Sequence, residues 1–388
     1  MRIAVIHSYY RTDVPSGENS AVDASVRILA GQGHEVLLIA RRTDIERTKP
    51  LYGLRAAVRV MTGVGASPDR ALEDFVPDVV HVHNLLPNFG SNWIERWQDR
   101  MLYTAHNFRT VCANGLLFRD GHNCIECTSK SSWAAIQHRC YQGKRLASIP
   151  VAFATRNGIA GSPLVTKSRK MIALSRAARN LFENWGVPAS RLAVVPNGVD
   201  DTMHRAGARS NGRWLVAGRI SEEKGVLELA RSWPSGFALD IVGTGPLASE
   251  VAALERSEVA LLGPWTRERL RESLAEYEGL VFPSTCLEMQ PTIVLEAMSA
   301  GVPIVALTGN AASELVDEHD CGESYTDAPS LKFALARMSE NRQIVGTRGR
   351  EAFERNFTQG VWLQEMEKLY AGVFSEGRPT AGGGGHSA

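Results

Sequence analysis

The sequence contains no apolar run close to the ~18–20 residues that a membrane-spanning helix needs, so no transmembrane segment is expected. Residues 1–6 hold one basic residue and a short apolar run, which is too little for a signal-peptide core. We therefore expect a cytoplasmic protein. No repeat occurs at a solenoid period. The hydrophobic fraction of 44% and the charged fraction of 22% are those of an ordinary globular protein, which excludes disordered and collagen-like classes.

Acidic residues are absent between Glu126 and Glu183, although the whole chain is almost balanced at 43 basic and 42 acidic residues. Ten lysines and arginines fall in or beside that gap: Lys130, Arg139, Lys144, Arg145, Arg156, Lys167, Arg169, Lys170, Arg176 and Arg179. Such a stretch attracts anions, including phosphates and anionic lipid surfaces. Solvated helix faces are the other interpretation. No contact with nucleic acid is expected.

The length of 388 residues exceeds the ~250–300 residues at which single cores stop growing, so two domains are expected. Short β-type runs alternate with helical ones in two series, which predicts α/β domains with doubly wound parallel sheets. We place the first domain at 1–196, the second at 211–356, a helix at about 357–373 that returns to the first domain, and a disordered tail at 374–388.

In open parallel sheets, ligands bind beyond the carboxyl ends of the strands. Two expected strands end on polar pairs, at His83-Asn84 and at His106-Asn107. Two such domains facing each other across a cleft would bring both sets of strand ends to one site.

A glycine-rich turn at Gly243 and Gly245 follows an expected strand and fits the pattern G-x-G-x-x-A. This pattern suggests a dinucleotide site, but no acidic residue closes the next strand, as such sites require. A tight strand–helix turn with some phosphate contact is the preferred interpretation.

Two cations, Arg219 and Lys224, flank another strand-to-helix turn. Arg binds a phosphate bidentately and Lys as a point charge, so the pair could neutralise a diphosphate without Mg²⁺. A salt bridge between Lys224 and a neighbouring glutamate is the structural alternative. Gly17 lies just before the first expected helix, where the backbone can approach an anion closely.

Glu288 lies in an expected strand–helix loop, and Glu296 about one turn into the helix that follows. Carboxylates accept strong hydrogen bonds from sugar hydroxyls. Two solvated surface glutamates are the alternative interpretation. The spacing of the pair after a strand is the observation that favours a functional site.

These motifs together resemble the retaining glycosyltransferases of family 4, which have the GT-B fold. The matching segments are 34–36, 77–83, 104–107, 195–200, 218–225, 241–246, 288–296 and 296–303. The resemblance covers residues 1–372 and is closest to members of bacterial polysaccharide or glycolipid type. It implies transfer of a sugar, of hexosyl type, from a UDP- or GDP-sugar to a glycan, lipid-linked or small-molecule acceptor.

By this resemblance, Arg219 and Lys224 hold the donor diphosphate, with Gly17 close to it. Glu296 would bind the donor ribose and Glu288 the transferred sugar, while His106 would sit at the reacting centre. No catalytic metal is implied. Asn107 departs from the family's frequent Asp, and the segment 289–291 departs from its Gly-aromatic-Gly.

Four cysteines are grouped after His106: Cys112, Cys124, Cys127 and Cys140. Four thiolates with one close pair suit a structural Zn²⁺ site. Reduced cysteines in a packed loop, or disulfides, are the alternatives, and a cytoplasmic location disfavours disulfides.

Two other functions remain open from the sequence. One is a non-catalytic GT-B-like module that uses the cysteine loop for protein contacts, and the other is an NAD(P)-dependent oxidoreductase. For the transferase, the basic stretch suggests peripheral contact with an anionic membrane at its inner face.

Overall fold

The computed structural model describes residues 1–12, 16–129, 131–201 and 210–376. The chain forms two compact units. The first contains 1–115, 126–195 and the chain from Leu363 onwards, and the second contains 116–125 and 196–362. Much of the predicted linker (202–209) and of the predicted tail (377–388) lies outside the described residues.

The first unit is built on a six-stranded sheet with the order β2-β1-β3-β4-β7-β8, in which every neighbouring pair is parallel. The strands are β1 (Arg2–Tyr9), β2 (Glu35–Arg42), β3 (Val79–Asn84), β4 (Met101–Thr104), β7 (Lys170–Ala173) and β8 (Leu192–Val194). The central strands β1, β3 and β4 are buried almost throughout, because parallel sheets are covered on both faces. This confirms the predicted α/β class.

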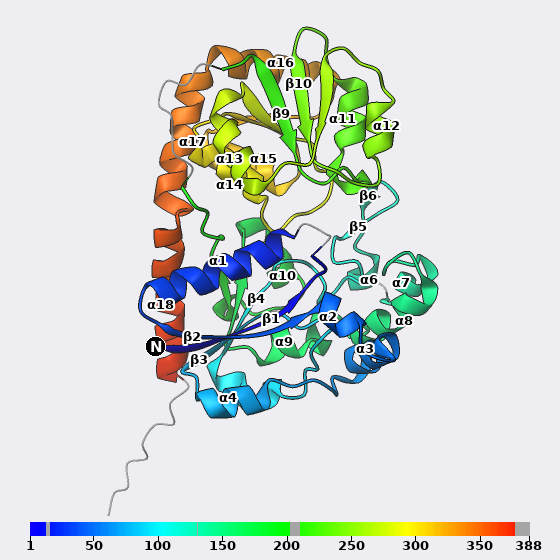
Figure 1. Ribbon diagram of the computed structural model, residues 1–388, viewed down its shortest axis with the longest axis vertical. Helices are drawn as coiled ribbons and strands as arrows, with labels where there is room; N and C mark the ends of the chain where they lie inside the picture. The colour runs from blue at the N-terminus through cyan, green and yellow to red at the C-terminus, as the bar shows by residue number, and fades with distance from the viewer. Residues whose placement is uncertain (13–15, 130, 202–209, 377–388) are drawn as a thin grey trace, which may run out of the picture. The chain divides into compact units, whose positions relative to one another are not determined.

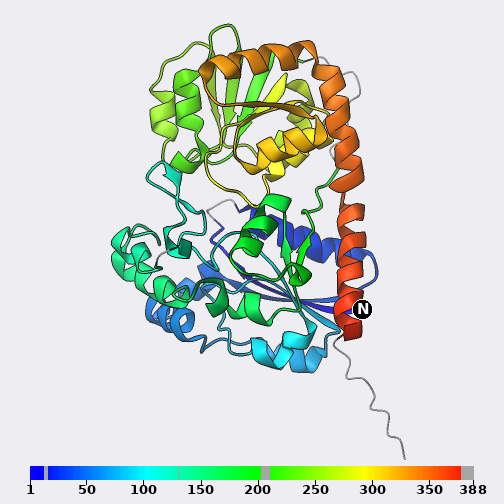
Figure 2. The same ribbon diagram turned by 180° about the vertical axis from the view of Figure 1, so that it is seen from behind.

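Helices cover this sheet (Figures 1 and 2). The helices of this unit up to β8 are α1 (Gly17–Gly31), α2 (Thr43–Arg47), α3 (Tyr52–Thr62), α4 (Asp69–Phe75), α5 (Ile94–Trp97), α6 (Glu126–Ser129), α7 (Ala134–Gln137), α8 (Arg145–Ala154), α9 (Pro163–Lys167) and α10 (Arg176–Asn184), of which α3, α6, α7 and α8 pack on one another beside the sheet. Ser16 caps α1, since its hydroxyl accepts a hydrogen bond from Asn19 N at 3.2 Å. The cap fixes where the chain turns from β1 into α1.

The second unit has a six-stranded parallel sheet with the order β11-β10-β9-β12-β13-β14. Its strands are β9 (Arg213–Ala217), β10 (Ala238–Val242), β11 (Val259–Gly263), β12 (Gly279–Phe282), β13 (Ile304–Leu307) and β14 (Gly322–Tyr325). Its helices are α11 (Val226–Ser232), α12 (Ala248–Ala252), α13 (Arg267–Ser273), α14 (Thr292–Ser299), α15 (Ala311–His319), α16 (Ala328–Glu340) and α17 (Arg342–Asn356). Counted in chain order, the strands follow the 3-2-1-4-5-6 pattern of doubly wound nucleotide-binding sheets.

Side-chain alternation along these strands creates two hydrophobic cores, one on each face of the second sheet. Leu215 and Leu280 pack into one core, which includes Leu295 of α14. Trp214 and Val281, one position away on the same strands, pack into the other, which includes Leu335 of α16. The period of two along a strand therefore covers both faces with apolar side chains.

In both sheets the strand order reverses beside the first strand. The reversal lies between β1 and β3 in the first sheet and between β9 and β12 in the second. Ligands of open α/β sheets bind at such switch points, beyond the carboxyl ends of the strands. The loops that follow β1, β3, β9 and β12 are therefore the places to look for function.

A small hairpin, β5 (Phe118–Arg119) with β6 (His122–Asn123), belongs to the segment of the chain that groups with the second unit. The last helix, α18 (Gln359–Glu376), joins the first unit from Leu363 onwards and continues three residues past its expected end at 373. Among the helices of the described residues, none is both long and apolar enough to cross a membrane.

Candidate functional site

The loop after β9 carries Lys224 and is held in place by a glycine. Residues Glu222–Lys224 form a short 3₁₀ turn that ends at Gly225, whose φ of 64° is in the left-handed region. A Cβ at this position would lie 2.3 Å from the carbonyl oxygen of Pro283 in the loop after β12. Only glycine satisfies both constraints, so Gly225 brings the two switch-point loops of the second unit into contact.

Lys224 and Glu288 form an ion pair at this switch point. Lys224 Nζ lies 2.6 Å from Glu288 Oε1, and the Ser284 hydroxyl donates to the same oxygen at 2.6 Å. Burial alone would lower the pKa of Lys224, but Glu288, helped by Cys286 and Glu223, outweighs it and raises that pKa. Lys224 is therefore a firmly charged cation in a half-buried position.

The loop that carries Glu288 is anchored from both sides. On one side the carbonyl of Glu223 accepts a hydrogen bond from Thr285 N at 3.0 Å. On the other side Asn310 Nδ2 donates to the carbonyl of Ser284 at 2.8 Å, while the Asn310 side chain caps α15. These bonds fix the backbone just before Glu288, which helps to preorganise its carboxylate.

Glu296 is buried on α14 with 3% of its surface exposed, and it pairs with Arg267. Arg267 Nε donates to Glu296 Oε1 at 2.8 Å, and a terminal guanidinium nitrogen of Arg267 lies 2.7 Å from the same oxygen. Sequence reasoning missed Arg267, because it lies 29 residues before its partner. The fold places both glutamates of the E-x7-E pair in ion pairs.

Gly243 and Gly245 have a packing role in the structure. A Cβ on Gly243 would lie 1.8 Å from the carbonyl oxygen of Gly218, and one on Gly245 would lie 2.2 Å from that of Ile220. The turn after β10 therefore packs directly on the turn after β9. Arg219, between those two carbonyl groups, has an exposed side chain.

His106 follows β4 in the first unit and belongs to a cluster of histidines. Its Nε2 lies 2.8 Å from His83 Nδ1, and the two rings stack at 5.1 Å. The rings of His81 and His83 are tilted against each other with centroids 4.1 Å apart, and His81 hydrogen-bonds Thr104 and Tyr370. Burial lowers the pKa of His106 to about 3 and holds that of His83 well below its ordinary value. Both rings are neutral near pH 7.

Sequence reasoning missed Glu18, which lies beside Gly17 at the start of α1. Its carboxylate accepts from Asn107 Nδ2 at 2.8 Å and from the Tyr10 hydroxyl at 3.0 Å. Burial raises the pKa of Glu18 to about 7, although Arg109 opposes the shift. The departure at Asn107 has a physical reason here, since an amide can donate to a carboxylate and an aspartate cannot. Gly17 itself is exposed, and a Cβ there would meet nothing within 4 Å.

The structure does not show the predicted zinc site. Among the described residues, no group of three or more His, Cys, Asp or Glu side chains could hold a metal ion. Cys124 belongs to the second unit, whereas Cys112, Cys127 and Cys140 belong to the first. Cys112 donates to Asn114, and Cys127 and Cys140 pack against apolar side chains. A zinc site at the four cysteines stays a prediction.

Family models match most of the chain. The model described as Glycosyltransferase Family 4 matches residues 16–202, and that described as Glycosyl transferases group 1 matches residues 212–341. The chain belongs to the family 4 glycosyltransferases of the GT-B fold. The second match includes the switch point between β9 and β12, and the first match includes β3 but begins after β1.

Individual relatives are distant. The chain is 27% identical to the exopolysaccharide phosphotransferase SCO2592 of Streptomyces coelicolor, over 56% of this chain and 25% of that protein. It is 22% identical to the amylovoran biosynthesis glycosyltransferase AmsK of Erwinia amylovora, over 53% of this chain and 57% of that one. The chain thus matches between a quarter and just over half of the length of these relatives.

Among solved structures, Alr3699/HepE of Anabaena in complex with UDP has a similar fold. The TM-score is 0.59 at 14% identity, over 96% of this chain and all of that one. At this identity the likeness concerns the fold alone.

Proposed function

We propose that this protein is a retaining glycosyltransferase whose second unit binds a nucleotide-sugar donor. The observation that carries the proposal is the ion pair between Lys224 and Glu288, fixed at the switch point of a sheet with nucleotide-binding strand order. The half-buried ammonium group of Lys224 suits a donor diphosphate, and the preorganised carboxylate of Glu288 suits the hydroxyls of the transferred sugar. The exposed guanidinium of Arg219 provides a second cation for the phosphates.

Donor recognition extends to Glu296 in this proposal. Its carboxylate would accept the ribose hydroxyls, with Arg267 keeping it ionised and oriented. The turn at Gly243 and Gly245 would place backbone N–H groups near the diphosphate, with Gly17 of the first unit a further contact. The fold-level likeness to an enzyme crystallised with UDP favours a UDP-sugar, and a GDP-sugar is the alternative.

His106 is proposed to act as a neutral hydrogen-bonding group at the reacting centre. Its pKa of about 3 makes it a poor proton donor at physiological pH, so it does not serve as a general acid. In a retaining transfer, a donor phosphate oxygen would take the proton of the acceptor hydroxyl, and the leaving diphosphate would be stabilised by Lys224 and Arg219. The transferred group is proposed to be a hexosyl unit.

The test is release of nucleoside diphosphate from a panel of UDP-, GDP- and ADP-sugars in the absence of acceptor. We expect release from one donor, and a loss of at least tenfold in both Lys224→Ala and Glu288→Gln. Lys332→Ala is the matched control, because Lys332 is an exposed lysine on α16, away from the switch point. It should retain wild-type release.

If no donor in the panel releases nucleoside diphosphate and no nucleotide stabilises the protein thermally, the transferase is refuted and the non-catalytic binding module remains. Release that survives in both variants would refute the assignment of the site. The anomeric configuration of the product, read by NMR, tests retention separately.

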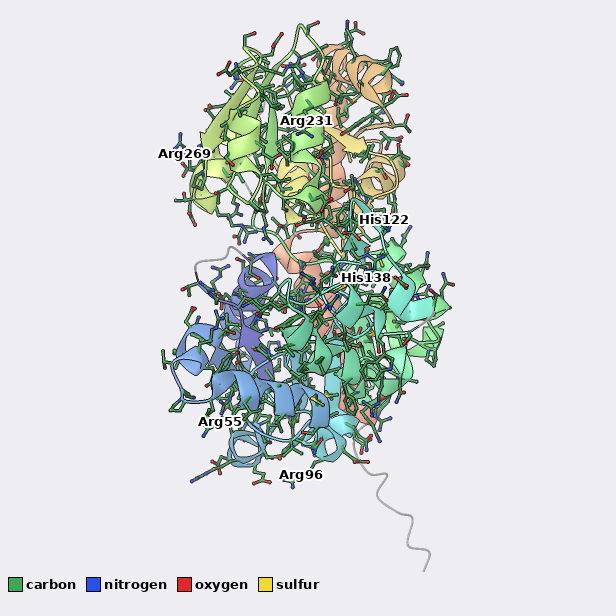
Figure 3. The ribbon with its side chains drawn as sticks, turned by 90° about the vertical axis from the view of Figure 1, so that its right-hand side faces the viewer. Arg55, Arg96, His122, His138, Arg231 and Arg269 are labelled. Carbon is green, nitrogen blue, oxygen red and sulfur yellow. The ribbon has the colours of Figure 1, made fainter. Side chains whose placement is uncertain are left out.

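The acceptor is proposed to be a glycan or a lipid-linked sugar at an anionic membrane. Helices α3 and α8 pack on each other and expose apolar side chains beside basic ones. The exposed residues are Leu54, Arg55 and Val58 on α3 and Arg145, Leu146 and Ile149 on α8. Figure 3 shows Arg55 on the outside of its helix. Apolar residues rimmed by cations suit the surface of an anionic bilayer.

Sedimentation with liposomes tests this contact. The protein should sediment with vesicles that contain 30% anionic lipid, and not with neutral vesicles. Binding should weaken at high salt and in Leu146→Ser with Arg145→Gln. Equal recovery with both vesicle types would contradict the membrane contact without affecting the donor assignment.

A further inference from the structure

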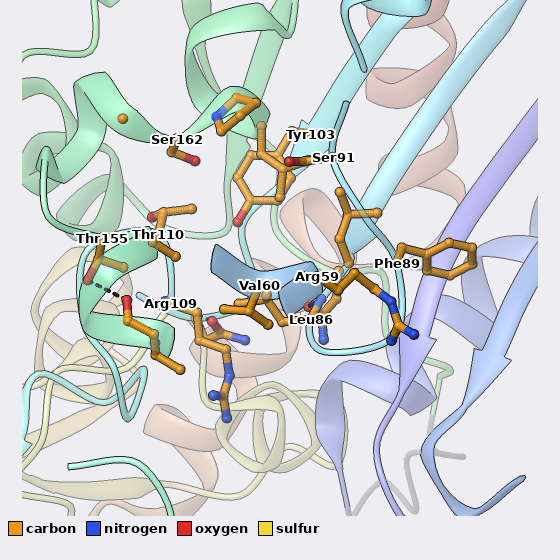
Figure 4. A pocket seen from close by; sticks show the side chains of 18 of the residues that line it. Arg59, Val60, Leu86, Phe89, Ser91, Tyr103, Arg109, Thr110, Thr155 and Ser162 are labelled. Carbon is orange, nitrogen blue, oxygen red and sulfur yellow. Dashed lines mark hydrogen bonds between the residues drawn. The ribbon is translucent and has the colours of Figure 1, made fainter. Parts of the chain in front are cut away.

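The first unit contains a cavity of about 110 Å³ beyond the ends of β3 and β4 (Figure 4). Residues that follow these strands form its wall, together with α3, α8 and the segment 161–164. His83 lines the cavity, and its Nδ1 is the atom that lies 2.8 Å from His106 Nε2. The cavity therefore borders the histidine pair at the carboxyl edge of the first sheet.

Four of the side chains that line this cavity carry a buried polar atom without a hydrogen-bond partner among the described residues. These atoms are Arg59 Nε, His83 Nε2, Arg109 Nε and Thr110 Oγ1. The side chains of Arg59, His83 and Thr110 are at least nine-tenths buried. An unsatisfied buried polar group costs about 1–3 kcal/mol, so native proteins hold few of them. All four atoms belong to side chains that line one cavity, which favours a polar ligand there over an apolar one.

The charge of the cavity is positive. Arg59 and Arg109 line it, while no aspartate or glutamate does. Among the described residues, Arg59 donates a hydrogen bond to the carbonyl of Pro87 at 2.9 Å, and burial, helped by Arg41 and opposed by Glu46, lowers its pKa. Arg109 lies over the rings of Tyr10 and Tyr141 and has Glu18 in its vicinity. A guanidinium group buried without a carboxylate at bonding distance favours an anionic ligand.

The rest of the lining mixes apolar and hydroxyl-bearing side chains. The apolar ones include Val60, Leu86, Phe89 and Leu164, and the hydroxyl-bearing ones include Ser91, Tyr103, Thr155 and Ser162. A water molecule needs about 10–15 Å³ by this measure, so the cavity has room for one small ring or several waters. A sugar ring has apolar C–H faces and hydroxyl edges, and it matches such a wall.

We propose that this cavity binds the acidic group of an anionic sugar acceptor. Arg59 and Arg109 would pair with the anion, and Thr110 and His83 would hydrogen-bond it or the sugar hydroxyls. The inference rests on the proposed transferase function, which it deepens by giving the acceptor a charge. The shared chemistry is a sugar ring with one anionic group, either a carboxylate or a phosphate ester.

Calorimetric titration of the full chain, without nucleotide, tests the proposal. The probes are glucuronate and galacturonate for the carboxylate, glucose 6-phosphate for the phosphate ester, and glucose as the neutral reference. At least one anionic probe should bind tenfold or more tightly than glucose. The class of probe that binds identifies the source of the anion.

Variants locate the binding. Arg59→Gln and Arg109→Gln should each weaken the anionic probe about tenfold or more, and glucose should be affected less. Arg96→Gln is the matched control, because Arg96 is an exposed arginine of the same unit (Figure 3), and it should bind as the wild type does. Thr110→Val keeps the side-chain shape and should weaken binding several-fold, which preserves the test if an arginine variant does not fold.

Anionic probes that bind no better than glucose would overturn the proposal, as would equal losses in Arg96→Gln. Because these titrations contain no donor, they are independent of nucleotide release. A chain that binds a sugar acid but releases no nucleotide would refute the transferase alone, and the reverse result would refute only the anionic acceptor.

Discussion

At the scale of single residues, the buried carboxyl group of Glu18 has a strongly shifted pKa in the first unit. Only 8% of its side chain is exposed, and one of its oxygens, Oε1, has no hydrogen-bond partner among the described residues. His7 Nδ1 lies 4.0 Å from that oxygen. Burial raises the pKa of Glu18 to about 7 and lowers that of His7 to about 4, so burial favours the neutral form of each group.

The raised pKa of Glu18 predicts a pH-dependent loss of stability. The folded state holds the proton up to about pH 7, whereas the unfolded state releases it near 4.5, so ionisation destabilises the fold as pH rises through this window. Glu18→Gln removes the titration. The variant should gain stability relative to wild type between pH 5 and 8, by on the order of 2 kcal/mol. Urea unfolding at both pH values measures it, and a difference that is constant with pH would contradict the shift.

At the scale of elements, the strands determine where the chemistry lies. The apolar runs of β1, β3, β4, β9, β10, β12 and β13 could be predicted from the sequence, because both faces of a parallel strand are buried. The edge strands β8 and β14 could not. The sequence of β14, Gly-Glu-Ser-Tyr, is half polar, and its strand conformation depends on backbone pairing with β13.

The candidate site was predictable to a similar extent. Lys224 and Glu288 could be picked out because each follows a strand, but their contact depends on the order of strands β9 and β12. The cysteine spacing does not by itself establish a metal site, and the zinc assignment stays a prediction; a hairpin at 118–123 lies between Cys112 and Cys124. Partners such as the buried Glu18 and the exposed Arg267 carry no local signal, because their roles come from tertiary contacts.

The contact between the two switch-point loops predicts the effect of Gly225→Ala. The new Cβ would clash with the Pro283 carbonyl, and φ would be strained, so the loop carrying Lys224 must move. Nucleotide release should fall at least tenfold, and stability should fall by about 1–3 kcal/mol. Gly53→Ala on α3 is the control, since a Cβ there meets nothing within 4 Å, and it should stabilise the helix by up to about 1 kcal/mol. Unchanged release in Gly225→Ala would contradict the role of this glycine.

At the scale of the whole molecule, the two units differ in how they respond to acid. The first unit contains four buried histidines whose pKa values burial lowers: His7, His81, His83 and His106. The folded state keeps them neutral, while the unfolded state protonates them near pH 6.5. Stability is therefore fully present above pH 6.5 and is lost as pH falls towards 4.

Each histidine lowers the unfolding free energy by up to about 1.4 kcal/mol for each pH unit of acidification in that window. Glu18 has the opposite effect, because its folded state binds the proton more tightly than the unfolded state does. Unfolding free energy should therefore fall steeply between pH 6.5 and 4.5. In His81→Gln, the slope of unfolding free energy against pH should decrease by the amount that corresponds to about one proton taken up on unfolding. Hydrogen exchange should show the loss in segments of the first unit, and a uniform loss over the chain would count against the histidines as its cause.

The central claim is that the nucleotide part of the donor binds at the switch point of the second unit. Hydrogen–deuterium exchange with and without the nucleoside diphosphate that the release assay selects tests this directly. We predict protection in the segments 218–225, 243–246 and 283–296, and its loss in Lys224→Ala. Protection confined to other segments, or unchanged protection in Lys224→Ala, would contradict the account.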